Sequence, residues 1–257
     1  MSSDNSQHAE LQKLKHFLQV EDESSFSFLQ KLNKDEVHEL RMKIIEVSQF
    51  TQTDIWKRLS GVANFFPNYM NAKIAQTVLG PLIAANMSYY MPEKDAIAIM
   101  KNMSTSFLAT VSEYMIPEKA VNLINQIPID ILKKVTIELV RDKKYLTAAG
   151  FVDVSDIARL IELSKVIYNE EDLIRISMYV ENKSYIAKIV ERFTDDKLEK
   201  IIKKAYQENL QDEILSVFVQ QSSNEVQRIL RIINELPEQL KTKVIKDFEN
   251  RIQNHGN

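Results

Sequence analysis

The residue types that most often hold metals or act as nucleophiles are scarce in this sequence. There is no cysteine, which excludes disulfides, thiolate metal ligands and a cysteine nucleophile. The four histidines are His8, His16, His38 and His255. Only His8 and His16 are close in sequence, two turns apart in a segment that we expect to be a surface helix. We therefore interpret them as surface side chains and not as zinc ligands.

Sequence motifs for nucleotide binding or hydrolysis are absent as well. The four glycines are isolated, and none belongs to a GxGxxG, GxxxxGK[ST] or GxSxG pattern. The many Ser, Thr, Asp and Glu residues are the types that cap helices and cover surfaces. We therefore predict that the chain is not an enzyme and uses no cofactor.

One acidic cluster has the residue types of a cation site. Hard cations such as Mg²⁺ or Ca²⁺ need several converging oxygen ligands. Asp153 and Asp156 begin one predicted helix, Glu162 follows within it, and residues 170–172 begin the next helix. Acidic side chains are also favoured at helix N-termini by the helix dipole. Helix capping is our main interpretation, and a weak metal site at Asp153, Asp156 and Glu162 is the alternative.

A second cluster is rich in aromatic residues and methionine. We expect most of it to form core between the N-terminal helices and the first repeat. The alternative is a groove for a peptide or an acyl chain, since these side chains make adaptable apolar surfaces. The candidate groove residues are Trp56, Phe65, Phe66, Tyr69, Met70, Tyr89 and Tyr90.

The elements that carry these residues follow a repeated pattern. Residues 91–115 and 116–140 each open with an apolar residue followed by Pro-Glu-Lys, and continue as two short amphipathic helices. A longer repeat relates residues 84–100, 145–161 and 214–230, at spacings of roughly 60–70 residues. Such repeats are typical of an α-solenoid, in which stacked helix pairs bury a continuous core.

Prolines and glycine mark the expected turns. Gly80-Pro81 should stop or bend a helix, and Ile127-Pro128 and Leu236-Pro237 should each place a tight turn before a new helix. We expect Ile127 and Leu236 to be buried. In the segment after Thr53, the apolar stripe Ile55, Leu59 and Val62 should face inward.

These patterns predict an all-α protein, a right-handed α-solenoid of short helix hairpins with an N-terminal helical cap. Residues 1–6 are expected to be a disordered tail, and residues 7–84 a helical region that packs on the repeats. Residues 85–250 should form the superhelix, and residues 251–257 a second tail.

The segment PEKAVNLINQIPIDILKKV, residues 117–135, resembles the helical repeats in the cytoplasmic N-terminal domain of MgtE magnesium transporters. The FliG-like superhelix is similar. The resemblance extends over roughly residues 85–245 and implies a right-handed stack of helix hairpins. Those transporters continue into nucleotide-sensing and membrane domains, for which this sequence shows no counterpart, and transport is therefore not implied.

Composition and charge limit the possible partners. The formal net charge is −3, with 33 basic and 36 acidic side chains, whereas nucleic-acid binders usually carry a basic stripe. The densest basic run, residues 197–204, is flanked by acids, and we interpret it as a solvated helix face. We therefore expect no nucleic-acid partner. We also expect no transmembrane segment and a cytoplasmic location, because the polar first residues lack the apolar run of a signal peptide.

Two functions fit these predictions. The first is a non-enzymatic scaffold that binds another protein on the concave face of the superhelix. The alternative is a protein that binds an apolar small molecule or lipid in the aromatic and methionine-rich groove near residues 56–91.

Overall fold

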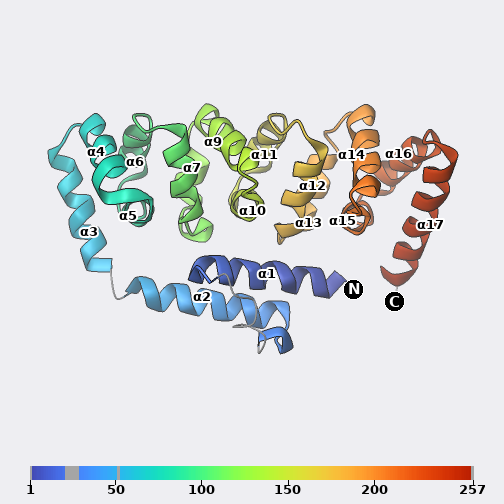
Figure 1. Ribbon diagram of the computed structural model, residues 1–257, viewed down its shortest axis with the longest axis horizontal. Coiled ribbons are helices and arrows are strands. Elements are labelled where there is room, and N and C mark those ends of the chain that lie inside the picture. The colour runs from blue at the N-terminus through green and yellow to red at the C-terminus, as the bar shows by residue number, and fades with distance from the viewer. Residues whose placement is uncertain (1, 21–28, 51–52, 256–257) are drawn as a thin grey trace. The chain divides into compact units, whose positions relative to one another are not determined.

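The computed structural model describes residues 2–20, 29–50 and 53–255, and these residues form helices joined by short turns (Figure 1). No strand occurs within these three ranges, which confirms the all-α prediction for them. The contacts between helices divide the chain into two compact units, Met1–Asp156 and Ile157–Asn257. The boundary predicted at residue 84 lies inside α5, which packs against α3 before it and against α7 after it.

The helical elements of the first unit are α1 (Ser2–Leu18), α2 (Lys34–Phe50), α3 (Thr53–Val62), the 3₁₀ turn η2 (Ala63–Phe65), α4 (Asn68–Ile74), the π-helical turn η3 (Ala75–Leu79), α5 (Gly80–Ser88), α6 (Glu93–Met100), α7 (Thr105–Glu113), the 3₁₀ turn η4 (Pro117–Lys119), α8 (Val121–Gln126), α9 (Ile129–Arg141) and α10 (Tyr145–Val154). Those of the second unit are α11 (Ile157–Ser164), α12 (Glu170–Tyr179), α13 (Lys183–Val190), α14 (Asp195–Gln207), α15 (Gln211–Phe218), α16 (Ser223–Asn234) and α17 (Glu238–His255).

The first and last helices extend into the segments predicted as tails. Helix α1 begins at Ser2 and α17 ends at His255, while residues 1, 256 and 257 lie outside the described ranges. The residues at the start of α1 are serine and aspartate, which favour helix N-termini. The local residue types therefore support helix where low hydrophobicity suggested a tail.

Side-chain caps and prolines determine where helices begin. Asn33 and Glu36 form a reciprocal capping box at the start of α2: the Glu36 amide donates to Asn33 Oδ1 at 3.0 Å, and the Asn33 amide donates to Glu36 Oε2 at 2.7 Å. Thr194 and Ser222 cap α14 and α16 in the same sense, each accepting from an amide three residues later. These caps satisfy amides that have no partner within the helix.

The predicted turns occur at the predicted residues. Gly80 adopts φ 77°, a conformation that glycine reaches without steric cost, at the junction of η3 and α5. Helix α8 ends at Gln126 and α9 begins at Ile129, with Ile127 and Pro128 extended between them. Ile127 and Leu236 are 6% and 4% exposed. The expected breaks and the burial of the residue before each proline are confirmed.

Within each unit, a helix packs mainly against the second helix after it. In the first unit, α3 contacts α5, α5 contacts α7, and α7 contacts α9, while α4 contacts α6 and α6 contacts α8. In the second unit, the same relation joins α11 to α13, α13 to α15, α12 to α14 and α14 to α16. The second unit has a core that includes the fully buried residues Leu198, Ile202, Phe218, Ile229 and Ile233. These contacts remove from water the apolar stripe that each short helix cannot bury alone.

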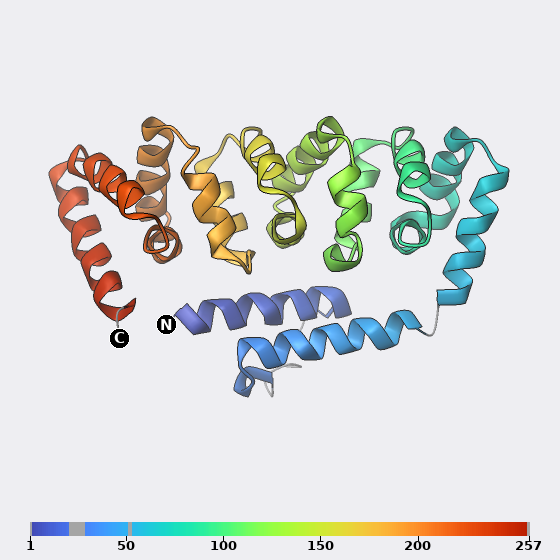
Figure 2. The same ribbon diagram turned by 180° about the vertical axis from the view of Figure 1, so that it is seen from behind.

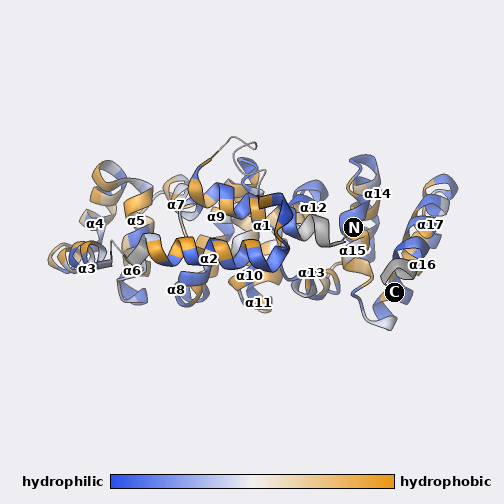
Figure 3. Ribbon diagram, turned by 90° about the horizontal axis from the view of Figure 1, so that it is seen from below, coloured by the Kyte–Doolittle hydropathy of each residue, from blue (hydrophilic) through white to orange (hydrophobic). Residues whose placement is uncertain are grey.

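Helices α1 and α2 form a hairpin of their own and run side by side in both views (Figures 1 and 2). Its small core consists of Leu11, Leu14, Leu29 and Val37. Hydrophobic and hydrophilic residues alternate along both ribbons, as expected for amphipathic helices (Figure 3). The hairpin therefore has one apolar seam, and outside it the side chains are mostly polar, apart from Val47, which is 66% exposed.

Candidate functional site

The first unit contains an apolar pocket of about 250 Å³ between its early helices. Helix α3, the turns η2 and η3, and helices α4, α5 and α6 all contribute to its wall. The lining residues are Leu59, Val62, Ala63, Phe66, Asn71, Ile74, Ala75, Leu79, Ala84, Met87, Met91, Ile99 and Met103.

The pocket wall presents almost no polar group. Asn71 is the one polar residue among the described lining residues, and its side-chain amide donates to the carbonyls of Ala63 and Phe66 at 2.8 and 3.0 Å. These two bonds engage the amide with the backbone of η2 and the residue after it. Three methionines, Met87, Met91 and Met103, supply flexible and polarisable surface. The pocket therefore suits an aliphatic or aromatic group and offers no group for acid–base or nucleophilic chemistry.

The apolar stripe of α3 borders this pocket and is not buried as the sequence predicted. Ile55 is 56% exposed and Val62 is 51% exposed, and Leu59 and Val62 line the pocket. The expectation of an inward stripe is wrong for Ile55 and Val62, which are more than half exposed, while Leu59 is half-buried. Residues spaced by three and four still share one face of the helix, and that face borders an open recess.

Exposed aromatic and aliphatic residues add to the apolar surface of this region. Phe65 is 83% exposed, Tyr69 62% and Phe66 41%. Val78 on η3 and Leu82 on α5 are 75% and 50% exposed. A surface that exposes so many large apolar side chains within one short part of the chain is characteristic of an interaction site.

The seven groove candidates divide into exposed, lining and internal residues. Phe66 lines the pocket, Phe65 and Tyr69 are exposed, and Trp56 and Met70 are half-buried. The remaining two, Tyr89 and Tyr90, are half-buried and engaged in hydrogen bonds. The Ile116 amide donates to the Tyr89 hydroxyl at 2.6 Å, and burial raises the pKa of that hydroxyl.

The hydroxyls of Tyr90 and Thr53 lie 3.3 Å apart. Tyr90 is thus an internal tie between α3 and the end of α5, and not an open contact residue. Sequence reasoning missed Ile74, Ile99 and Met103 as pocket residues. Their spacing marks them only as helix-face residues, and no local pattern shows which helix faces enclose a shared space.

The acidic candidates for a metal site have other partners. The Lys13 ammonium lies 3.1 Å from Asp153 Oδ2, and Glu162 of α11 forms an ion pair with Lys165, the residue that follows this helix. Asp156 is exposed, and its amide donates to Asn125 Oδ1 at 3.1 Å. Lysine partners for two of the three carboxylates favour ion pairing over cation binding. The helix-capping interpretation is wrong for Asp153, which lies in the last turn of α10 and not at a helix start, whereas residues 170–172 do begin α12.

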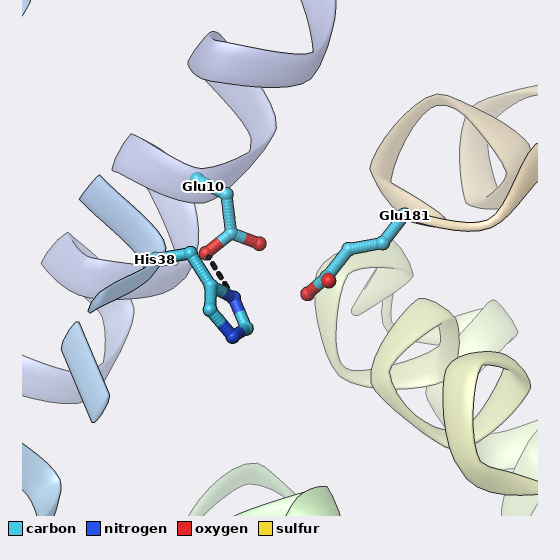
Figure 4. Close-up of side chains that lie close together, drawn as sticks. All are labelled: Glu10, His38 and Glu181. Carbon is cyan, nitrogen blue, oxygen red and sulfur yellow. Dashed lines mark ion pairs between the residues drawn. The ribbon is translucent and has the colours of Figure 1, made fainter. Parts of the chain in front are cut away.

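A buried charge cluster joins the α1–α2 hairpin to the rest of the first unit. Arg41, 4% exposed, donates from Nε to Glu10 Oε2 at 3.1 Å and from Nη1 to Glu118 Oε1 at 2.8 Å. His38 Nδ1 lies 3.3 Å from the same Glu10 oxygen (Figure 4). Glu181, also labelled in that figure, belongs to the second unit. The contacts of Glu10 and Arg41 are those of a structural ion-pair network.

The basic run of α14 is balanced by acids. Lys200 pairs with Asp196, Lys203 with Glu199, and Lys204 with Glu208, each within α14 or at its end. Paired lysines of this kind are typical of a solvated helix face.

Within the described ranges, every helix is too short or too polar to cross a bilayer. Comparison with protein-family models, curated proteins and solved structures finds no match to this chain. The geometry of the pocket and its surroundings is therefore the basis for a functional assignment.

Proposed function

We propose that the chain is a cytoplasmic helical-repeat module that binds another protein and catalyses no reaction. Its helix hairpins stack as a right-handed α-solenoid with the α1–α2 hairpin as an N-terminal cap, similar to the N-terminal domain of MgtE transporters. The packing of α3–α8 in the first unit, and of α11–α15 in the second, each on the second helix after it, supports this arrangement within each unit. The repeated breaks at Ile127-Pro128 and Leu236-Pro237 support it as well.

The observation that carries the binding proposal is the exposed apolar surface around the pocket of α3–α6. A soluble domain rarely leaves several large apolar side chains of one region in water unless they serve binding. Hot spots of protein interfaces are commonly bulky side chains inserted into apolar pockets. We assign the partner to this surface, which we name the α3–α5 surface and define by Ile55, Val62, Phe65 and Tyr69 together with the pocket-lining Ala84 of α5.

The volume of the pocket favours a protein partner over a small molecule. Sites for drug-sized ligands usually occupy about 300–1,000 Å³. The pocket has about 250 Å³, and much of the exposed apolar area is contributed by residues that do not line it, such as Phe65 and Tyr69. An inserted side chain accounts for the pocket, and the rest of a protein interface accounts for the exposed aromatic residues.

A small apolar molecule or a lipid chain is the second candidate, and the nearly complete absence of polar groups in the pocket favours it. Native mass spectrometry of gently purified protein separates the two candidates. A co-purifying lipid that is released when Ala84→Leu narrows the pocket supports the second candidate.

The protein-binding proposal is tested by affinity capture with matched variants. Phe65→Asp and Tyr69→Asp should each abolish recovery of the partner, because a charge would be desolvated at the apolar interface. Tyr168→Asp is the control, since Tyr168 is 81% exposed and lies in the second unit. A partner captured equally by wild type, both surface variants and the control contradicts the assignment, and so does the recovery of no specific partner.

A further inference from the structure

The charges on the segment that forms the α3–α5 surface differ in sign from those of the whole chain. Residues 53–91 contain three cations, Lys57, Arg58 and Lys73, and a single acid, Asp54. The segment therefore has a formal charge of +2, whereas the chain has −3. A local excess of one sign steers a partner of the opposite sign and selects against partners of the same sign.

These three cations are available to a partner. Lys57, Arg58 and Lys73 are exposed, and none of them forms an ion pair with the part of the chain that the structure describes. Many other basic residues do, as Lys200 and Arg228 illustrate. Arg58 is four residues before Val62, so the two side chains are neighbours on one side of α3. A guanidinium therefore flanks the apolar pocket wall.

The apolar groups of α3 have the spacing that receives a helix. Ile55, Leu59 and Val62 follow at intervals of four and three residues, which is the seam that amphipathic helices bury against one another. The pocket beside this seam has room for a bulky side chain. Recognition of an amphipathic helix by an apolar groove uses the same arrangement of a stripe and an anchor pocket.

We propose that the partner element is an acidic amphipathic helix that inserts one bulky apolar side chain into the pocket and places an Asp or Glu residue near Arg58. This inference rests on the proposed protein-binding function and names the class of partner. An anionic membrane would also meet cations and aromatic side chains. The recess favours a peptide, because a lipid surface gains nothing from a concave pocket that accepts one side chain.

The test uses a phage-displayed library of random 16-residue peptides selected against the immobilised full chain. We expect enriched peptides to combine Leu, Ile or Phe at helical spacing with an excess of Asp and Glu. Binding of the enriched peptide is then measured through the fluorescence of Trp56, the sole tryptophan, which lies one turn before Leu59 on α3.

Two variants and one matched control locate the peptide. Lys57→Glu combined with Arg58→Glu should weaken binding by about tenfold, and added salt should weaken wild-type binding more than that of the variant. Ala84→Leu, which narrows the pocket, should also abolish binding of the peptide. The control, Lys134→Glu combined with Lys188→Glu, reverses two exposed cations elsewhere and should bind as wild type does.

Each other outcome overturns the inference in a distinguishable way. Two outcomes contradict the acidic helix and leave the protein-binding function intact. In the first, the enriched peptides need the open pocket but are not acidic. In the second, the peptides bind the Lys57/Arg58 variant with unchanged affinity. Failure to enrich any peptide that depends on the pocket contradicts both. Self-association abolished by Ala84→Leu identifies a second copy of this chain as the occupant. Binding to vesicles of 3:1 phosphatidylcholine and phosphatidylglycerol that requires Phe65 and Arg58 identifies a membrane.

Discussion

Arg41 and Glu118 are 77 residues apart in sequence, and their side chains form an ion pair with a Nη1–Oε1 distance of 2.8 Å. This pair joins α2 of the N-terminal hairpin to η4. The same guanidinium also contacts Glu10 of α1, whose side chain is fully buried. One arginine thus links both helices of the hairpin to the helices that follow.

Replacing Arg41 should destabilise the first unit. Arg41→Ala leaves the buried Glu10 carboxylate without its arginine and should cost about 3 kcal/mol of unfolding free energy, near the lower end for such a loss because Lys13 lies 3.6 Å from Glu10. Urea denaturation measures the change. The exposed residue Lys134 provides the control, since Lys134→Ala should change stability by less than about 0.5 kcal/mol. Equal effects of the two substitutions would show that the network contributes nothing.

Substitution by alanine should change stability in different directions at two glycines. A Cβ on Gly150 of α10 would lie 2.8 Å from Pro117 Cγ, closer than carbon atoms can pack. Gly150→Ala should therefore cost about 1–3 kcal/mol. Gly61 of α3 has no neighbouring atom within 4 Å of such a Cβ, and Gly61→Ala should be neutral or stabilise by up to about 1 kcal/mol. Thermal unfolding of both variants checks the pair, and a stable Gly150→Ala protein would refute the close contact of α10 with η4.

The turn between α8 and α9 should be sensitive at Ile127 and tolerant at Pro128. Ile127→Asp would bury a charge without a partner and should cost at least about 3 kcal/mol. Pro128→Ala should cost about 1 kcal/mol or less, mainly by loosening the unfolded chain. Ile137→Asp on α9 is the control, because Ile137 is 45% exposed. Denaturant titration should give Ile127→Asp a far lower free energy of unfolding than Pro128→Ala or Ile137→Asp. A mild effect at Ile127 would contradict its burial.

Stability should decline at alkaline pH because of Tyr89. Burial raises the pKa of its hydroxyl above the ordinary value of about 10. The contribution of this hydroxyl to stability is therefore complete below pH 10 and is lost as the pH rises further. Tyr89→Phe should flatten the dependence of unfolding free energy on pH above 10. At neutral pH it should cost about 1–2 kcal/mol, because the Ile116 amide loses its acceptor. Denaturation curves from pH 8 to 11 test both effects, with exposed Tyr168→Phe as the comparison; an unchanged alkaline slope in Tyr89→Phe would refute the prediction.

Divalent cations should change stability little. A cation at 100 times its dissociation constant would add about 2.7 kcal/mol, and we expect less than about 0.5 kcal/mol from millimolar Mg²⁺. The reason is that Asp153 is paired with Lys13. Melting temperatures with and without Mg²⁺ provide the measurement. An increase of several degrees that disappears in Asp153→Asn with Asp156→Asn would instead establish a metal site.

The positions of the helices could largely be predicted from residue types that are close together in the sequence. The period of apolar residues predicted helices throughout, and the turns at Gly80 and Pro128 follow from the backbone limits of glycine and proline. The weakest predictions concerned the first and last residues, where low hydrophobicity suggested tails but the structure has α1 and α17.

The sequence by itself determined an all-α chain in the described ranges, the absence of cysteine chemistry and the residues at which helices break. These properties depend on neighbours within a few residues along the chain. Only the tertiary structure decided that the α3 stripe stays open, that Ile74, Ile99 and Met103 share a pocket with Phe66, and that Arg41 reaches Glu118. A helical period shows that a residue belongs to a face, but whether that face is buried depends on which distant segment packs against it.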